Sequence, residues 1–120
     1  MLIFERDALV RDTCAKLADN LDCDLYSTAY IDNFENIVRR FRPTSIVIDV
    51  GLLESDDMDL LRLIADDVPD AKVLFLSGDD AILAREAEGL ARSVGLSVDG
   101  VLQRPVTEAA LEQSLQRIAL

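Results

Sequence analysis

Two short, almost wholly apolar segments limit most strongly the folds that this chain can adopt. Residues 45–50 read Ser-Ile-Val-Ile-Asp-Val, and residues 73–76 read Val-Leu-Phe-Leu. A strand with one face in water alternates apolar and polar side chains, whereas a run without alternation is typical of a central strand in a parallel sheet, which helices cover on both faces. The two segments therefore predict a buried parallel sheet.

Weaker strand patterns and amphipathic helical patterns alternate around these two segments. The further strands are expected at residues 2–4, 25–30 and 98–103, and Gly100 interrupts the last of them. Apolar side chains at helical spacing predict helices between all of the strands and after the last one. These helices are expected over residues 8–21, from the region of residue 32 to residue 41, over 57–68, from about 80 to about 94, and after residue 107.

Polar residues at the predicted helix starts indicate how these helices are capped. Asp32 and Glu35 resemble a capping box, Asp79 or Asp80 can cap the fourth helix, and Thr107 can cap the last one. Strands that alternate with crossover helices give a parallel sheet with helices on both faces. The sequence therefore predicts one domain over residues 1–120, with a doubly wound α/β fold of five parallel strands.

The charge and composition exclude several classes of function. Lys and Arg number 12 and Asp and Glu number 23, which gives a net charge of −11. Nucleic acids and anionic membranes need a basic surface, so neither is expected as a direct partner. The chain contains no His, which excludes His-based zinc sites and Ser-His or Cys-His catalytic pairs. It contains no Trp and few aromatic residues, which disfavours a platform for base stacking.

Targeting and redox features indicate the cytoplasm. Cys14 and Cys23 have no metal-ligand spacing, and two buried thiols are favoured over the one disulfide that they could form. No segment approaches the roughly 18 apolar residues of a membrane span. The first residues are acidic and lack the basic region of a signal peptide. We therefore predict a cytoplasmic protein.

The residues with chemical potential follow the predicted strands directly. In a doubly wound sheet, ligands collect at the carboxyl ends of the strands, near the switch in strand order. Two carboxylates, a hydroxyl and a guanidinium are expected to converge there. The residues at these strand ends are Glu5, Arg6 and Asp7; Asp49 and Gly51; Ser77 and Gly78; and Arg104 and Pro105.

This set of groups fits phosphoryl chemistry. A carboxylate in a water-poor crevice can attack phosphorus, and Asp49 is the candidate nucleophile. The charge on the incoming oxygens needs a metal, a cation and hydroxyl donors. Glu5, Asp49 and the Gly51 carbonyl could supply oxygen ligands to Mg²⁺. Ser77 and Arg104 would each bind a phosphoryl oxygen.

With these motifs in order, the whole chain resembles the receiver domains of bacterial two-component response regulators. The resemblance is carried by Leu-Ile-Phe-Glu-Arg-Asp-Ala-Leu-Val-Arg at the start, Ile-Val-Ile-Asp-Val-Gly-Leu-Leu at 46–53, Val-Leu-Phe-Leu-Ser-Gly at 73–78 and Gly-Val-Leu-Gln-Arg-Pro at 100–105. Residues 95–105, Gly-Leu-Ser-Val-Asp-Gly-Val-Leu-Gln-Arg-Pro, are most similar to the corresponding segment of receivers linked to EAL-type cyclic-di-GMP phosphodiesterase domains.

The resemblance implies a flavodoxin-like fold and a regulatory role rather than an enzyme's, with at most self-phosphorylation and dephosphorylation. It implies phosphorylation of Asp49 by a sensor histidine kinase or a phosphotransfer protein, dependence on Mg²⁺, and control of an output domain or partner protein through the face around the fourth helix, fifth strand and fifth helix. It also implies a cis bond between Arg104 and Pro105.

The chain departs from the family pattern at the pocket. Receivers place two acidic residues after the first strand, where this chain has Glu5 and Arg6, so Arg6 stands at the position of the usual direct metal ligand. Arg104 replaces the usual Lys, which keeps the charge and changes its geometry. The usual Pro and Gly after the phosphoacceptor and the usual aromatic residue on the fifth strand are also replaced. The residues at those positions are Leu53, Asp57 and Val101.

These departures leave alternatives open. Arg6 either enters the crevice and pairs with Asp49 in place of a metal ion, or points to solvent. Glu5 is a metal ligand, or a surface acid, or pairs with Arg6. Ser77 binds a phosphoryl oxygen or caps the following helix. Asp7 is expected to be a solvated charge at the rim.

Three functions follow from these alternatives. The first is a phosphoacceptor receiver. The second is a degenerate receiver that acts without phosphorylation as an interaction or dimerisation module, with a possible homodimer through Leu83, Leu90 and Val101. The third, a flavodoxin-like cofactor domain, is disfavoured, because Glu5-Arg6-Asp7 is the opposite of a phosphate-binding loop.

Overall fold

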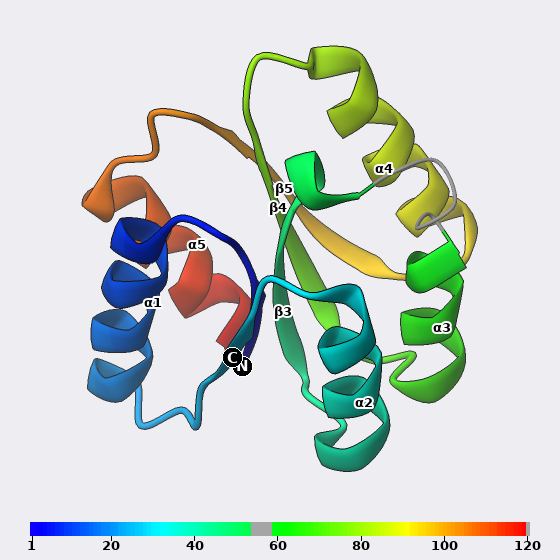
Figure 1. Cartoon of the computed structure of the whole chain (residues 1–120), viewed down its shortest axis with the longest axis horizontal. Helices are drawn as coiled ribbons and strands as arrows, with labels where there is room; N and C mark the ends of the chain where they lie inside the picture. The colour runs from blue at the N-terminus through cyan, green and yellow to red at the C-terminus, as the bar shows by residue number, and fades with distance from the viewer. Residues whose placement is uncertain (54–58, 120) are drawn as a thin grey trace.

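The computed structural model describes residues 1–53 and 59–119, and within them five parallel strands form one sheet. The spatial order of the strands is β2-β1-β3-β4-β5 (Figure 1). Every predicted strand is present, and the two apolar segments form neighbouring central strands. The strands are β1 (Leu2–Phe4), β2 (Tyr26–Thr28), β3 (Ser45–Asp49), β4 (Lys72–Ser77) and β5 (Ser97–Gln103).

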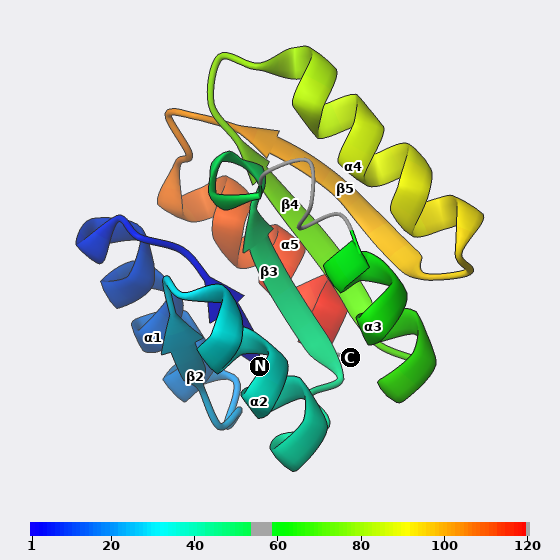
Figure 2. The same cartoon turned by 45° about the vertical axis from the view of Figure 1, so that its right-hand side comes forward.

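Helices cover both faces of this sheet. The first and last helices pack side by side on one face, and the other three lie on the opposite face, as the two views of Figures 1 and 2 show. The helices are α1 (Ala8–Asn20), α2 (Ile31–Phe41), α3 (Asp59–Asp67), α4 (Ala81–Ser93) and α5 (Glu108–Ala119), and a short 3₁₀ turn, η1 (Val50–Leu52), follows β3. The doubly wound α/β fold is thus confirmed.

Each central strand contributes side chains to two separate apolar cores. Val47 and Leu74 point toward α1 and α5, together with Ile3 of β1. Ile48 and Phe75 point the other way, toward α2, α3 and α4. Successive side chains of a strand point to opposite faces, so a strand buried on both faces must be apolar throughout. This requirement explains the unbroken apolar segments in the sequence.

The predicted helix caps are confirmed in α4 and α5 and wrong in α2. The Asp80 side chain accepts a hydrogen bond from the Leu83 amide at 2.9 Å, and the Thr107 hydroxyl accepts one from the Ala110 amide at 3.1 Å. In α2, Tyr30 is the residue before the helix and gives no side-chain cap, while Asp32 already lies in the first turn. The capping box fails because the helix begins earlier than the Asp32–Glu35 spacing requires.

Gly100 marks an irregularity in β5, as expected. Val73 of β4 pairs with Val98, but the next residue, Leu74, pairs with Gly100, so Asp99 is an extra residue in the edge strand. Gly100 has a φ of +148°, in the region that L side chains rarely adopt. At this bulge, the Asp99 side chain forms an ion pair with Arg117 of α5.

Both cysteines are free thiols, but only one of them is buried as expected. Cys14 lies in the core between α1 and the sheet, whereas Cys23 is half-buried. Burial, with a smaller effect of the Glu5 charge, raises the pKa of the Cys14 thiol to about 12, so this thiol stays protonated at neutral pH. In the described part of the chain, no helix is long and apolar enough to cross a membrane. The predicted helix start at Asp57 lies outside the described residues.

Candidate functional site

The candidate site lies where the strand order reverses, between the carboxyl ends of β1 and β3. The chain runs from β1 outward to β2 and then crosses to β3 on the other side of β1. At such a point the connections leave in opposite directions and open a crevice at the sheet edge. Glu5 follows β1, Asp49 ends β3, Ser77 ends β4 and Arg104 follows β5. The topology thus brings four residues from the length of the chain to one edge, as the sequence predicted.

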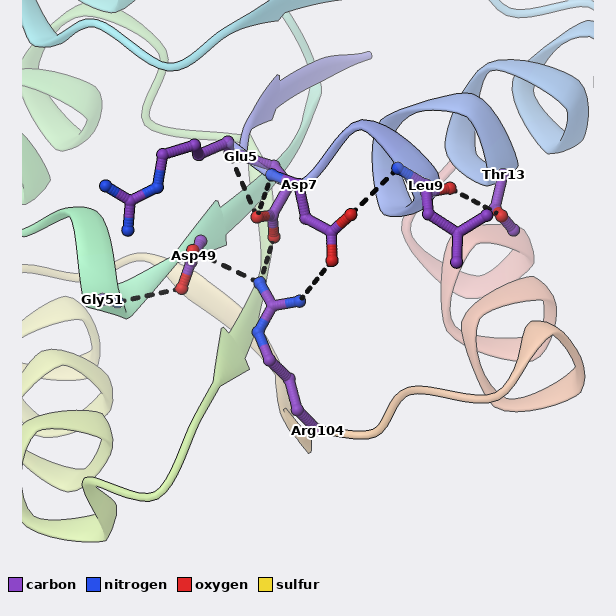
Figure 3. A network of polar contacts seen from close by, with 8 residues as sticks. Glu5, Asp7, Leu9, Thr13, Asp49, Gly51 and Arg104 are labelled. Atoms are coloured by element: carbon purple, nitrogen blue, oxygen red, sulfur yellow. Dashed lines mark hydrogen bonds and ion pairs between the residues drawn. The ribbon is translucent and has the colours of Figure 1, made fainter.

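Arg104 is the centre of the polar contacts at this edge (Figure 3). Its Nη2 donates to Glu5 Oε2 and lies 3.3 Å from Asp49 Oδ2. Its Nη1 lies 3.9 Å from Asp7 Oδ2. One guanidinium therefore joins carboxylates that come from the ends of β1 and β3.

Glu5 is a buried carboxylate with both oxygens occupied. Its side chain is 1% exposed. Oε1 accepts hydrogen bonds from the backbone amides of Arg6 at 3.0 Å and Asp7 at 2.9 Å, and Oε2 accepts from Arg104. Burial and the Asp49 charge raise the pKa of Glu5 above its ordinary value, against the lowering effects of the Asp7 amide and Arg104, with burial the largest single cause. Glu5 is neither a surface acid nor a partner of the Arg6 side chain, and those alternatives are wrong.

Asp49 both ends β3 and begins the turn that follows. Its side chain is 11% exposed, and Oδ1 accepts a hydrogen bond from the Gly51 amide at 2.9 Å. A β-carbon on Gly51 would lie 3.2 Å from that same oxygen, so a larger residue there would press against the carboxylate. The Gly51 amide thus binds the Asp49 carboxylate, and the absence of a side chain on Gly51 leaves room for it. The predicted role of its carbonyl as a metal ligand stays a prediction.

Arg104 is held in place by the backbone as well as by its side chain. Its amide donates to the Ser77 carbonyl at 2.8 Å, and its peptide bond to Pro105 is cis, as the resemblance implied. Burial lowers the pKa of Arg104, but the hydrogen bond and charge of Glu5 and the charges of Asp49 and Asp7 together raise it. The guanidinium therefore remains charged in the pocket. It faces the pocket, as predicted.

Ser77 is at the predicted edge but makes a different contact from the predicted one. Its side chain is buried, and its hydroxyl donates to the Gly78 carbonyl at 3.4 Å. The alternative role of Ser77 as a helix cap is wrong, because Asp80 caps α4. The expected contact with a phosphoryl oxygen stays a prediction, which requires the hydroxyl to rotate away from Gly78.

Of the two alternatives for Arg6, the structure agrees with the one in which the side chain points to solvent, and the pairing of Arg6 with Asp49 is wrong. Arg6 is exposed, and it forms no ion pair with any residue in 1–53 or 59–119. The physical reason lies in the turn after β1, where the Arg6 amide donates to the preceding side chain, Glu5, and the chain moves away from the sheet. Arg104, from the opposite end of the sequence, contacts Asp49 instead.

Asp7 makes more contacts than the solvated rim charge that was expected from the sequence. Besides its contact with Arg104, Asp7 Oδ1 accepts a hydrogen bond from the Leu9 amide at 2.9 Å and so caps α1 (Figure 3). An Asp immediately before the first helical residue is a recognised capping signal that could have revealed this role. Asp7 is half-exposed, so the expectation of a rim position is correct but incomplete.

The arrangement of these carboxylates does not fit a bound Mg²⁺ ion. Mg²⁺ needs oxygen ligands at about 2.0–2.1 Å in octahedral geometry. Both oxygens of Glu5 and both of Asp49 already contact nitrogen donors, and the Arg104 guanidinium lies between the two side chains. Among the residues that the structure describes, no group of three or more metal-ligating side chains is assembled. The Mg²⁺ site expected at Glu5, Asp49 and Gly51 is thus unsupported by this geometry.

Comparisons with solved structures identify the fold. A response regulator from Colwellia psychrerythraea superposes with a TM-score of 0.76 at 20% identity, covering 98% of this chain and 94% of the other. A CheY-like receiver domain protein from Methanospirillum hungatei gives a TM-score of 0.77 at 15% identity, over 97% of this chain and 89% of the other. A signal receiver domain from Bermanella marisrubri gives 0.74 at 16% identity, over 99% and 96%.

No protein-family model matches the chain, and no curated protein matches it by sequence. The fold is therefore that of response-regulator receiver domains, at identities that leave the function to be argued from the residues of the site.

Proposed function

We propose that this chain is a signal-transduction receiver domain that accepts a phosphoryl group on Asp49. The observation that supports this function best is the position of Asp49, at the carboxyl end of a central strand, at the switch point of the sheet, with a cation 3.3 Å from its oxygen. A sensor histidine kinase or a phosphotransfer protein would supply the phosphoryl group. The domain would in turn control an output domain or a partner protein, so its role is regulatory rather than enzymatic.

The chemistry requires few groups. An oxygen of Asp49 attacks the phosphorus of a phosphohistidine, a P–O bond forms, the P–N bond breaks, and its electron pair returns to the imidazole. Arg104 must then exchange its contact with Asp49 for one with the phosphoryl oxygens, to which its planar fork is well matched. The Ser77 hydroxyl can donate to another of these oxygens once it releases the Gly78 carbonyl. Mg²⁺ is the cofactor that the resemblance implies, and no step here depends on it.

The test is incubation with acetyl phosphate, followed by intact-mass spectrometry. We expect the wild type to gain the mass of one phosphoryl group and Asp49→Asn to gain none. Asp79→Asn is the matched control, because it removes an exposed carboxylate beyond the end of β4 and should leave the gain unchanged. No mass gain in the wild type, with or without Mg²⁺, would contradict the phosphoacceptor function.

A second candidate is favoured by the contacts of Asp49. Oδ1 accepts a hydrogen bond from Gly51, Oδ2 lies in an ion pair with Arg104, and Arg104 also joins Asp49 to Glu5 in a largely buried cluster. These contacts suit a domain that signals by binding alone, as a phosphorylation-independent interaction or dimerisation module. In this case the wild type stays unmodified by acetyl phosphate while it keeps its partner, and Asp49→Asn leaves partner binding intact.

We also propose that the domain works in the cytoplasm of a bacterium, without direct contacts to nucleic acid or membrane. An EAL-type output domain is one candidate partner.

The possible homodimer needs a different test from the one that its residues suggest. The three residues named above for it are half-buried and pack against the core: Leu83, Leu90 and Val101. Ile82 on the same helix is 71% exposed, so Ile82→Glu is the cleaner variant for a light-scattering test of dimerisation.

A further inference from the structure

We propose that the guanidinium of Arg104 is the resident cation of the pocket and that it closes the pocket to divalent metal ions. The proposal deepens the function above, on which it rests for the identity of the site. The carboxylates of Glu5 and Asp49 must be neutralised whether or not Asp49 is ever phosphorylated.

The first step is the charge balance within the pocket. Nη2 of Arg104 contacts both Glu5 and Asp49, so these two carboxylates lie within reach of one nitrogen atom. Their side chains are 1% and 11% exposed, which leaves water little access to screen their repulsion. Two adjacent buried carboxylates are stable together only if one of them is protonated or a positive charge lies between them. Arg104 is the positive charge that the structure places there.

The second step is the occupancy of the carboxylate oxygens. Glu5 Oε1 accepts from two backbone amides, and Asp49 Oδ1 accepts from a third, that of Gly51. The other oxygen of each side chain contacts the same nitrogen atom, Nη2 of Arg104. A metal ion bound by these two oxygens would occupy the volume of the guanidinium. Metal binding therefore requires that Arg104 leaves first.

The third step is the suitability of an arginine for this position. A guanidinium offers several donors in a fixed plane, so one group can contact Glu5 and Asp49 through Nη2 and approach Asp7 through Nη1. Its backbone is tied to β4 by the hydrogen bond from the Arg104 amide to the Ser77 carbonyl. A lysine at this position would present a single compact ammonium and leave more of the pocket open. The side chain at residue 104 therefore decides whether a metal ion can enter.

The experiment is a calorimetric titration of the folded chain with Mg²⁺, without any phosphoryl donor. We expect no saturable binding to the wild type at millimolar Mg²⁺. Arg104→Gln removes the cation while keeping a polar side chain, and we expect it to bind Mg²⁺ at least about tenfold more tightly than the wild type, with a matching rise in its melting temperature. Arg117→Gln is the matched control, because it changes the net charge equally at an ion pair outside the pocket. It should behave as the wild type does.

Two outcomes would overturn the proposal. One is saturable Mg²⁺ binding by the wild type that Asp49→Asn abolishes. The other is a folded Arg104→Gln protein, as judged by circular dichroism, that binds Mg²⁺ no better than the wild type. If Arg104→Gln does not fold, Arg104→Lys takes its place with the same expected gain, and absence of that gain also overturns the proposal. Because no phosphoryl donor is present, a failure of Asp49 phosphorylation would leave these results unchanged.

Discussion

Two arginines of this chain contact carboxylates from distant elements, and they differ both in geometry and in environment. Arg117 of α5 holds Asp99 in the β5 bulge through two contacts, of 2.9 Å from Nε and 3.0 Å from Nη2. Arg104 holds Glu5 and Asp49 together. The Arg117 side chain is 58% exposed and its partner Asp99 is 14% exposed. The Arg104 side chain is 27% exposed, and its two nearer partners, Glu5 and Asp49, are 1% and 11% exposed.

The difference shows that good hydrogen-bond geometry does not measure the importance of an ion pair. Water and salt screen an exposed pair, and its residues are well hydrated when the pair is broken. A buried carboxylate that loses its counter-charge has no such replacement, so its desolvation becomes a net cost. Arg104 neutralises two adjacent carboxylates, one of them only 1% exposed, whereas Arg117 pairs with one carboxylate and is itself 58% exposed. We therefore expect the loss of Arg104 to cost more than the loss of Arg117.

The largest expected effect is that of Arg104→Met. The substitution keeps an unbranched chain of similar length but leaves Glu5 and Asp49 without a cation. We expect a loss of about 3 kcal/mol in the free energy of unfolding, because one partner of a buried cluster is removed. Urea unfolding monitored by circular dichroism measures this quantity.

Arg117→Met is the matched comparison, since it makes the same chemical change at the exposed pair. Equal losses in the two variants would break the comparison, because burial would then have no bearing on either arginine. Arg104→Met can also be combined with Glu5→Gln. If the double variant does not show the loss in the free energy of unfolding that Arg104→Met shows alone, the cost comes from the buried Glu5 carboxylate, which would sharpen the comparison.

The pH dependence of stability should show the second effect. Burial raises the pKa of Glu5 above its ordinary value of 4.5, so the folded state binds this proton more readily than the unfolded state does. The stability that Glu5 contributes is therefore complete below pH 4.5 and is lost as the pH rises through the folded-state pKa. As the pH rises through the folded-state pKa of Glu5, we expect the free energy of unfolding of the wild type to fall relative to that of Glu5→Gln. Urea unfolding at a series of pH values checks the sign.

Glu108→Gln controls for the loss of one negative charge, because Glu108 is exposed at the start of α5. If the stability difference between the wild type and Glu108→Gln changed with pH as much as that for Glu5→Gln, the effect would reflect overall charge. The contrast between buried and exposed carboxylates would then lose its support.

The sequence predicted the sheet well because its signal is local. The apolar runs that became β3 and β4 end within one residue of the observed strands, since burial on both faces requires them to be apolar. The strand expected at residues 25–30 is shorter in the structure, Tyr26–Thr28, because it lies at the sheet edge and pairs only with the three residues of β1. Its length depends on a neighbour rather than on its own pattern.

The site was predicted in its members but not in its contacts. Asp49, Ser77 and Arg104 stand where strand ends must place them. The choice between Arg6 and Arg104 as the pocket cation depends on a turn after β1 and on a contact between residues 99 positions apart, Arg104 and Glu5. Arg104 is the first residue after β5, whereas Arg6 is the second residue after β1 and follows Glu5. Side chains of successive residues in extended backbone point in opposite directions, so the two arginines need not face the same side.

The smallest effect is expected at the surface pair of Arg117 and Asp99, and its dependence on salt is the more informative measurement. An exposed ion pair is screened within a Debye length, about 8 Å at physiological ionic strength. The stability difference between the wild type and Arg117→Met should therefore shrink as NaCl is raised toward molar concentration. The difference for Arg104→Met should shrink less, because Arg104 is 27% exposed and its nearer partners, Glu5 and Asp49, are buried away from the salt solution. If both differences shrank to the same extent, the Arg104 cluster would be open to solvent, and the pocket would not be the closed, internally neutralised site described above.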